Sequence, residues 1–519
     1  MRSVETVLFL VVVATVVATF ARRLRVPAPS LLVVAGVLVG LVPGVPEIQV
    51  TPEVVSLVVL PPLLFAAGEE LPGRDLRAVW RPVAVLAIGL VIGSAVGIGA
   101  LAVAITPLSA EMALVLGAVL ASTDPVAVTA LGRRLSLPPR LQALVQAESL
   151  FNDATSLLLF RIALSLVVAG STLSASHTVL QFLLLAGGGT AAGVIVAAGI
   201  GLVRSRTEDA VLETVVSLVT PYLAYVLAEG VHASGVTAVV VASVILGTQA
   251  TRLSSPQTRL QLAAVNQTVI FLLESVVFGL IGLQLPTLIH GISGVDATWP
   301  LQAIAISAAL ILIRILWVFP LSAVIQHRSG HRPSWQVPAV VAWAGARGVV
   351  PLAASLSIPF FTDEGLPLPH RDLVQLLATA VIVISLVVQG FTLAPLVRRA
   401  GVAMTGADVH DEVMRARLRL AQAALGHLEQ VANAEAAPDV LIEQLRRSWQ
   451  ARIDRLDTQP AQPTDSLAAS YRRLLRDLLE VERTELEHLF RSGAITDATR
   501  RSIQRTLDLE DAGLGDDDI

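Results

Sequence analysis

Two carboxylates and an amide interrupt a long apolar segment of this 519-residue chain. Glu148, Asn152 and Asp153 lie between residues 141 and 168, where nearly all other side chains are aliphatic, aromatic or small hydroxyl groups. A charge at membrane depth is costly, so it faces a protein interior or an aqueous cavity and marks a functional site by default. A carboxylate oxygen there suits a proton or a hard cation. The stretch predicts an ion site; the alternative is that Asp153 makes only a structural hydrogen bond or lies near a span end.

Two further apolar runs contain residues that break helices. Ser122-Thr123-Asp124-Pro125 lies within residues 112–131, and Ala344-Gly345-Ala346-Arg347-Gly348, followed by Pro351, lies within residues 336–361. Proline removes a backbone donor and clashes with the preceding turn, so we expect a break near Thr123. Broken spans expose backbone carbonyls and amides from which secondary transporters build cation sites. A simple proline kink is the alternative, but Asp124 can neutralise the exposed helix ends.

Charged residues within apolar runs need partners. Glu148 is turned away from Asp153 on the same predicted helix, so we expect it to pair with Arg347 and to leave Asp153 free for a cation or proton. Glu274 and Arg314 are expected to form a second internal pair, in preference to a direct role in transport, because buried charges are normally paired.

Composition identifies an integral membrane protein, with 54% hydrophobic and 15% charged residues. The chain has no cysteine and no lysine, which excludes disulfides, thiolate metal sites and a phosphate-binding loop with its lysine. We find no nucleophile, base and metal constellation, so no enzymatic activity and no cofactor are expected. No nucleic-acid motif is present, and the net charge of -4 is too small to favour such a partner.

Thirteen apolar runs are each near the roughly 20 residues that a helix needs to cross a bilayer. They lie near residues 4–21, 28–42, 53–68, 82–105, 112–131, 141–168, 178–203, 210–228, 234–250, 262–289, 300–325, 336–361 and 372–397. Arginines follow the odd-numbered runs and are nearly absent after the even-numbered ones, Arg371 being the exception. Cytoplasmic loops carry the basic excess, so we expect an outside amino terminus and a cytoplasmic carboxyl terminus in the cell membrane.

The two broken runs are the fifth and the twelfth, seven runs apart, and therefore cross in opposite directions. This predicts two inverted-topology repeats, runs one to six and eight to thirteen, with the seventh as a linker. Residues 1–399 form the predicted transmembrane domain. Residues 400–519 are rich in charge, with leucines at helical spacing, and predict a cytosolic tail of about four helices with a regulatory or assembly role.

Four motifs together resemble the sodium/proton exchangers of the monovalent cation:proton antiporter family, of the NhaP and NHE type in its bacterial form. They begin at Leu60 (Leu-Pro-Pro-Leu-Leu-Phe-Ala-Ala-Gly), Ser122 (Ser-Thr-Asp-Pro-Val-Ala-Val), Glu148 (Glu-Ser-Leu-Phe-Asn-Asp) and Ala344 (Ala-Gly-Ala-Arg-Gly). The resemblance implies an all-helical, NhaA-like antiporter fold with crossed broken helices. It also implies a homodimer in which a core domain moves like an elevator.

The resemblance further implies which residues carry the site. Asn152 and Asp153 match the family's pair, with Asp153 binding either the cation or the proton. Oxygen ligands to Na+ would come from Ser149 and from the region of Thr123, and Asp124 is counted in the same site. Glu148 would pair with Arg347. The sequence departs from the family at Ala66, where an acid is common; Glu69 and Glu70 follow it and are the candidates to replace that acid.

The expected function is antiport of one monovalent cation, sodium foremost, against a proton across the lipid bilayer. Because a single carboxylate would titrate, we expect electroneutral exchange. A potassium/proton exchanger of the same fold is the first alternative, and lithium is a further candidate ion. A gated cation channel is an alternative from another class, and would carry large currents without proton coupling.

Overall fold

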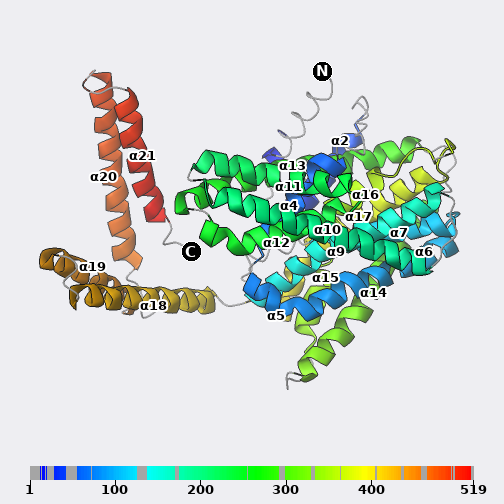
Figure 1. The fold of residues 1–519 in the computed structure, drawn as a ribbon, viewed down its shortest axis with the longest axis horizontal. Helices are drawn as coiled ribbons and strands as arrows, with labels where there is room; N and C mark the ends of the chain where they lie inside the picture. The colour runs from blue at the N-terminus through cyan, green and yellow to red at the C-terminus, as the bar shows by residue number, and fades with distance from the viewer. Residues whose placement is uncertain are drawn as a thin grey trace. The chain divides into compact units, whose positions relative to one another are not determined.

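The computed structural model describes most of the chain and shows it to be helical. Its described residues are 28–42, 55–71, 73–124, 137–169, 175–207, 209–253, 255–291, 298–328, 334–362, 364–403, 406–433, 438–457, 465–492 and 497–515, with a few isolated positions. Within them there is no strand, only two isolated bridges. The chain divides into two compact units, Met1–Ala403 and Met404–Ile519, close to the predicted change of composition (Figure 1). The predicted all-helical class is confirmed.

The first unit contains the apolar helices. Seven helical segments of the described part are long and apolar enough to cross a membrane, and four shorter apolar helices accompany them. The helices are α2 (Ala28–Gly40), η1 (Val55–Val59), α4 (Leu60–Glu69), α5 (Gly73–Ala84), η2 (Val85–Leu90), α6 (Val91–Ile105), α7 (Ala110–Ala121), α9 (Pro139–Ala169), α10 (Ala175–Arg204), α11 (Ala210–Gly230), α12 (Gly235–Leu253), α13 (Pro256–Gly291), α14 (Trp299–Arg328), α15 (Gln336–Trp343), α16 (Val349–Leu356) and α17 (Arg371–Ala400).

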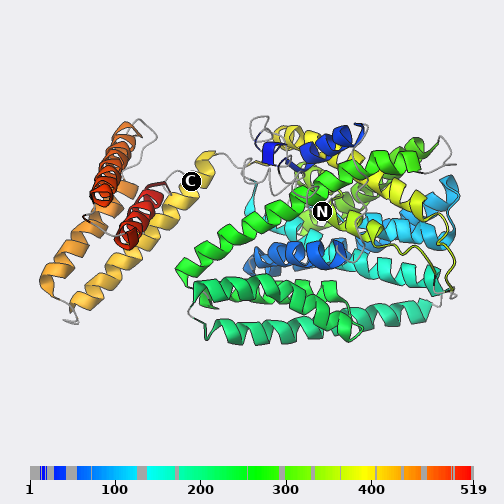
Figure 2. The ribbon, with the colours of Figure 1, turned by 90° about the horizontal axis from the view of Figure 1, so that it is seen from above.

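By their contacts with one another these helices sort into two groups, which meet along α9, α13 and α17. Figure 2 shows the ribbon from above. One group comprises α2, α4, α11, α12 and α13, with α10 against α11 and α12. The other comprises α6, α7, α9 and α14 to α17. Close backbone approach holds the first group together, since Gly36 of α2 and Gly282 of α13 face each other with no room for a side chain.

The predicted break in the twelfth apolar run is confirmed. Helix α15 ends at Trp343, helix α16 begins at Val349, and residues 344–348 between them are not helical. In the fifth run, α7 ends at Ala121, and Ser122 and Thr123 are extended or irregular. Pro125 and the second half of this run lie outside the described residues, as does most of the first run.

One predicted loop is a helix. Arg74, Arg77 and Arg81 were expected on an inner loop before the fourth run, but they lie on α5, which continues through η2 into α6. Helix α5 is amphipathic, with Val79 and Val83 buried and the arginines on its other side. A helix pairs its own backbone N–H and C=O groups, and its apolar side can pack against neighbouring helices. This segment can therefore be helical where a loop was predicted.

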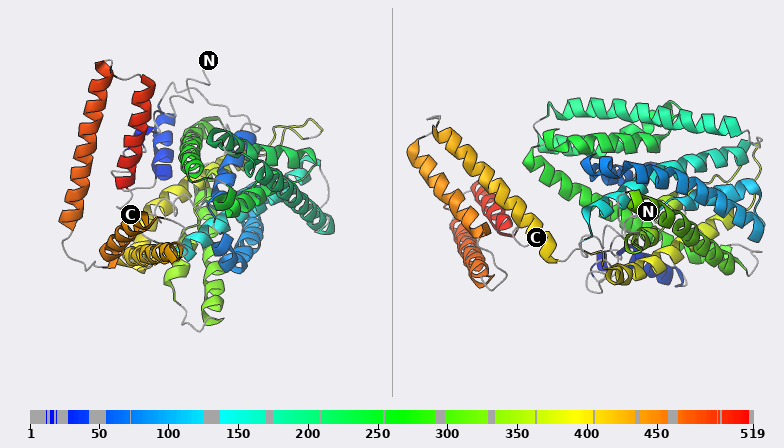
Figure 3. Two further views of the ribbon diagram at one scale, coloured as in Figure 1. Left: turned by 60° about the vertical axis from the view of Figure 1, so that its left-hand side comes forward. Right: turned by 90° about the horizontal axis from the view of Figure 1, so that it is seen from below.

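The second unit is four helices that pack as two hairpins (Figure 3). They are α18 (Gly406–Asn433), α19 (Asp439–Asp457), α20 (Asp465–Arg491) and α21 (Asp497–Gly515), which agrees with the predicted number of about four helices. Leu479, Leu486 and Leu507 form the apolar contact between α20 and α21. Arg483 adds ion pairs to Asp508 and Asp511 at 3.0 and 2.9 Å.

Candidate functional site

The two interrupted segments cross each other inside the second helix group. The Asp124 N–H donates to the Ala346 carbonyl oxygen at 2.7 Å, and the two residues form an isolated antiparallel bridge. The crossing thus joins the residues after α7 to the residues between α15 and α16. Helix ends that stop here carry backbone groups without helical partners, and these groups must be satisfied within the protein.

A carboxylate accepts a hydrogen bond from a free backbone N–H group at the start of α16. Asp124 Oδ2 accepts a hydrogen bond from the Val349 N–H at 3.2 Å. An anion at a helix N-terminus is favoured by both the free N–H groups and the helix dipole. A Cβ on Gly348 would overlap the Asp124 carboxylate, so glycine is what lets the two segments approach. Asp124 therefore acts at a helix end, as the sequence led us to expect of a charge at a break.

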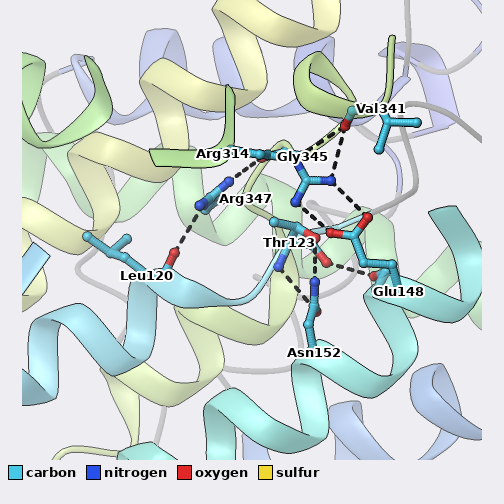
Figure 4. Close-up of polar contacts among 9 residues, drawn as sticks. Leu120, Thr123, Glu148, Asn152, Arg314, Val341, Gly345 and Arg347 are labelled. Carbon is cyan, nitrogen blue, oxygen red and sulfur yellow. Dashed lines mark hydrogen bonds and ion pairs between the residues drawn. The ribbon is translucent and has the colours of Figure 1, made fainter. Parts of the chain in front are cut away.

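An arginine donates a hydrogen bond to a free backbone carbonyl at the end of α7. Arg347 Nε donates to the Leu120 carbonyl oxygen at 3.0 Å, and Nη1 donates to the Gly345 carbonyl (Figure 4). Arg347 is 4% exposed, and its side chain links the two broken segments. A cation at a helix C-terminus complements the carbonyl groups there. Arg347 thus links α7 to the α15–α16 break through backbone oxygens.

The buried ion pair of this site is Glu148 with Arg314. Arg314 Nη1 and Nη2 donate to the two Glu148 oxygens at 2.5 and 3.0 Å, and both side chains are about fully buried (Figure 4). Nε and Nη2 also donate to the Val341 carbonyl at the end of α15, at 3.2 and 3.1 Å. The predicted Glu148–Arg347 pair is therefore wrong, because α14 brings Arg314 to the Glu148 side of α9 while Arg347 turns toward α7.

The predicted Glu274–Arg314 pair is corrected by the same geometry. Nη1 and Nη2 of Arg314 bind the two oxygens of Glu148, and the other hydrogen bonds of Arg314 go to the Val341 carbonyl. Among the described residues Arg314 is therefore paired with Glu148 and not with Glu274. Glu274 lies on α13, in the first helix group. A Cβ on Gly345 would overlap the Arg314 side chain, which explains the first glycine of the Ala-Gly-Ala-Arg-Gly motif.

Asp153 lies beside the crossing and accepts a hydrogen bond from it. Ser122 Oγ donates to Asp153 Oδ1 at 2.5 Å, and Asp153 is 7% exposed. Ser122 is the first residue after α7, so the helix break determines where its hydroxyl lies. Ser122 opens the Ser-Thr-Asp-Pro motif but was not among the predicted ligands; its position immediately before Thr123 is the signal in the sequence that points to it.

The other predicted ligands bind the same extended segment. Ser149 Oγ donates to the Thr123 carbonyl at 2.7 Å, Asn152 Nδ2 donates to Thr123 Oγ1 at 2.6 Å, and the Thr123 N–H donates to Asn152 Oδ1 at 3.4 Å. These side chains and Asp153 share one face of α9, because residues three and four apart align on a helix. The site brings together carboxylate, hydroxyl, amide and carbonyl oxygens, the ligands that hard cations prefer.

The acids that follow Ala66 lie in a different environment. Glu69, at the end of α4, accepts from Arg204 Nη1 at 3.5 Å and from Asn266 Nδ2 at 3.4 Å. Glu70 is exposed. These contacts belong to the first helix group, with α10 and α13, whereas Asp153 belongs to the second. The structure gives neither glutamate a contact with Asp153.

We expect Gly348→Ala to disrupt the crossing. The added methyl must displace Asp124 from the start of α16, which loses a helix cap of about 0.5–2 kcal/mol and adds overpacking of about 1–3 kcal/mol. Thermal unfolding in detergent should show a clearly lower midpoint. Gly199→Ala is the matched control, since no atom lies within 4 Å of the Cβ position in α10 and alanine favours a helix. Equal midpoints for the two variants would contradict this account of Gly348.

Comparisons with known proteins agree with one another. The family model for the transmembrane sodium/hydrogen exchanger matches residues 10–399. An uncharacterized Na(+)/H(+) exchanger of Mycobacterium tuberculosis is 33% identical over 98% of this chain and 96% of its own length. The Na(+)/H(+) antiporter ApNhaP of Aphanothece halophytica is 31% identical over 93% and 92%. The sodium proton antiporter MjNhaP1 of Methanocaldococcus jannaschii shares the fold, with a TM-score of 0.62 and 18% identity over 77% of this chain and 99% of its own.

Proposed function

Since the chain belongs to the transmembrane sodium/hydrogen exchanger family, we propose that it exchanges sodium for a proton and that both ions use the carboxylate of Asp153. The chain is a membrane transport protein, not an enzyme. The observation that carries the proposed site is that Asp153 is buried beside two interrupted helices and accepts a hydrogen bond from Ser122, a residue of the break itself. The site is thus part of the crossing, where cation sites of secondary transporters form.

The proposed coordination shell consists of Asp153 with neutral oxygens. Ser122 places its hydroxyl against the carboxylate, the Ser149 hydroxyl and the Thr123 carbonyl bind each other in the adjoining segment, and Asn152 holds Thr123 in position. We assign Asp124 to the start of α16, where its charge supports the site without leaving the break. Within the described residues no three His, Cys, Asp or Glu side chains gather into a metal cluster. One charged ligand among neutral oxygens fits a monovalent cation.

The mechanism that we propose is competition between the cation and the proton for one carboxylate. A protonated Asp153 is neutral, a cation-loaded Asp153 is also neutral overall, and an empty ionised Asp153 carries a buried charge. If only the neutral forms reorient, one cation moves against one proton. The other buried carboxylate on α9, Glu148, is bound to Arg314, so Asp153 is the carboxylate of this helix left for the ions, and electroneutral exchange is expected.

The membrane organisation that we propose keeps thirteen spans, with the amino terminus outside and the carboxyl terminus in the cytoplasm. Two features support the inverted repeats. The broken segments are seven runs apart, and the helices sort into two packed groups in which each half of the chain contributes to both. We propose that the group with α7, α9, α15 and α16 moves against the other as an elevator. We further propose a homodimer, and a regulatory or assembly role for residues 400–519.

Potassium is the second candidate cation. A relative from Bacillus subtilis, described as a sodium, potassium, lithium and rubidium/H(+) antiporter, is 30% identical over 70% of this chain and 56% of its own length. The neutral ligands around Asp153 are hydroxyl and carbonyl oxygens, which bind either ion. Cation preference therefore depends on the distances between these oxygens in the loaded state.

The test is cation-driven proton movement in sealed vesicles that contain the purified protein. We expect an outward gradient of sodium to drive protons inward, and exchange to continue unchanged when valinomycin and potassium hold the membrane potential at zero. Parallel gradients of lithium and potassium identify the substrate. A current without a proton gradient, far above carrier turnover, would instead establish a channel, and an absence of proton movement with all three cations would refute the proposal.

A further inference from the structure

A second set of polar side chains holds the crossing from the side opposite α9. Ser385 and Gln389 lie one turn apart on α17, and both are buried, at 8% and 2% exposed. Ser385 Oγ accepts a hydrogen bond from the Arg347 N–H at 3.0 Å and donates to Gln389 Oε1 at 2.5 Å. The Arg347 N–H lies in the non-helical segment between α15 and α16, so this bond satisfies a backbone donor of the break.

The contacts of Arg347 extend this link to Asp153. The Arg347 side chain binds the Leu120 carbonyl in the last turn of α7. Ser122, two residues further on, donates to Asp153. The hydroxyl of Ser385 therefore fixes the backbone that carries Arg347, and Arg347 fixes the helix end that carries the hydrogen-bond donor of the ion site.

The arrangement repeats in the two halves of the chain. On α9, Ser149 and Asn152 both bind Thr123 in the first break; on α17, Ser385 binds Arg347 in the second break and is itself bound to Gln389. Helices α9 and α17 correspond to the sixth and thirteenth apolar runs, which are seven runs apart like the two breaks. On each of the two corresponding helices a serine thus binds the backbone of a break, with an amide side chain about one turn further along the helix.

The Gln389 side chain lowers the stability of the fold through a polar group that is unpaired within the described part of the chain. Its Nε2 is buried and has no hydrogen-bond partner among the described residues. A buried donor without a partner lowers stability, and an apolar side chain of similar shape would avoid that loss. Polar groups that a fold retains against its own stability are concentrated at functional sites.

We propose that Ser385 and Gln389 are positioning residues for ion exchange, which act through Arg347 and Ser122 on the cation affinity of Asp153. This inference rests on the proposed function. Removal of the Ser385 hydroxyl frees the Arg347 backbone, and a loss of one hydrogen bond of about 1 kcal/mol at the site corresponds to about a three- to tenfold change in affinity. Gln389 only orients the Ser385 hydroxyl, so its effect is smaller and in the same direction.

The experiment measures the apparent KM for sodium in vesicles with full-length protein, together with the thermal unfolding midpoint in detergent. We expect Ser385→Ala to raise KM about three- to tenfold and Ser385→Thr, which keeps the hydroxyl, to restore most of it. Gln389→Met should raise KM by a smaller factor while its unfolding midpoint equals or exceeds that of the wild type. Ser355→Ala is the control, because Ser355 is a buried serine of α16 whose Oγ binds only Leu352 of its own helix.

A double variant tests the route through the crossing. Ser122→Ala should raise the KM for sodium by itself. When Ser122 is already replaced, Ser385→Ala should raise KM by a smaller factor than it does in the wild type, since both substitutions act on the same hydrogen bond to Asp153. A KM for Ser385→Ala equal to that of Ser355→Ala, or factors that multiply in the double variant, would overturn the positioning role while leaving the exchange function intact. A wild type without sodium-driven proton movement would overturn both.

Discussion

Asp153→Asn should abolish cation-driven proton movement, leaving the signal of vesicles without protein. The amide has nearly the shape of the carboxylate and can still accept from Ser122, so the crossing should stay intact. It carries no charge to bind a cation and takes up no proton near neutral pH. The expected result is thus loss of exchange with normal folding, which size-exclusion chromatography and the thermal unfolding midpoint check in the same preparation.

The matched control is Asp372→Asn. Asp372 is in the first turn of α17 and pairs with Arg371 at 3.4 Å, with its side chain 67% exposed. The same chemical change at an exposed carboxylate should leave exchange near the wild-type rate. If Asp153→Asn retained exchange at the level of Asp372→Asn, the assignment of Asp153 as the shared site would be refuted, although membership of the family would stand.

Glu148→Gln should be among the most destabilising single substitutions in the membrane unit. It leaves the Arg314 guanidinium buried without a counter-charge, and breaking a buried pair in this way costs about 3–5 kcal/mol. Arg314→Met should cost at least as much, because it also leaves the Val341 carbonyl at the end of α15 without its donor. Unfolding midpoints in detergent, measured on protein of equal purity, provide the comparison.

The double variant Glu148→Gln/Arg314→Met separates the ion pair from the helix end. No unpaired charge remains in it, so most of the lost unfolding free energy should be recovered. The remaining loss of about 1–3 kcal/mol should reflect the Val341 carbonyl without its donor. Arg161→Met is the control on the same helix. Arg161 pairs with Glu229 at 2.7 Å, but both side chains are about one-third exposed, so we expect a cost of about 0–1 kcal/mol. A Glu148→Gln midpoint no lower than that of Arg161→Met would contradict the structural role of the pair.

The sequence by itself determined the membrane class, the polar residues of the candidate ion site and the interruption of the twelfth apolar run. These features are local. Apolar runs of about 20 residues, a carboxylate within one of them, and Gly or Pro at a helix break each follow from residue type and spacing. The four helices of residues 400–519 were predictable for the same reason, since leucines at helical spacing within a charged segment indicate amphipathic helices.

Only the tertiary structure decided which side chains meet at the site. Arg314 and Arg347 both lie in apolar runs, and nothing in their spacing shows that α14 delivers Arg314 to Glu148 while Arg347 turns to the end of α7. Ser385 likewise reads as an ordinary hydroxyl residue in an apolar helix until α17 places it beside the Arg347 N–H. Pairing between distant helices depends on how they rotate and cross, and a single sequence carries no periodic signal for that. The residues of the candidate site could therefore be proposed from the chain, whereas their supporting contacts required the fold.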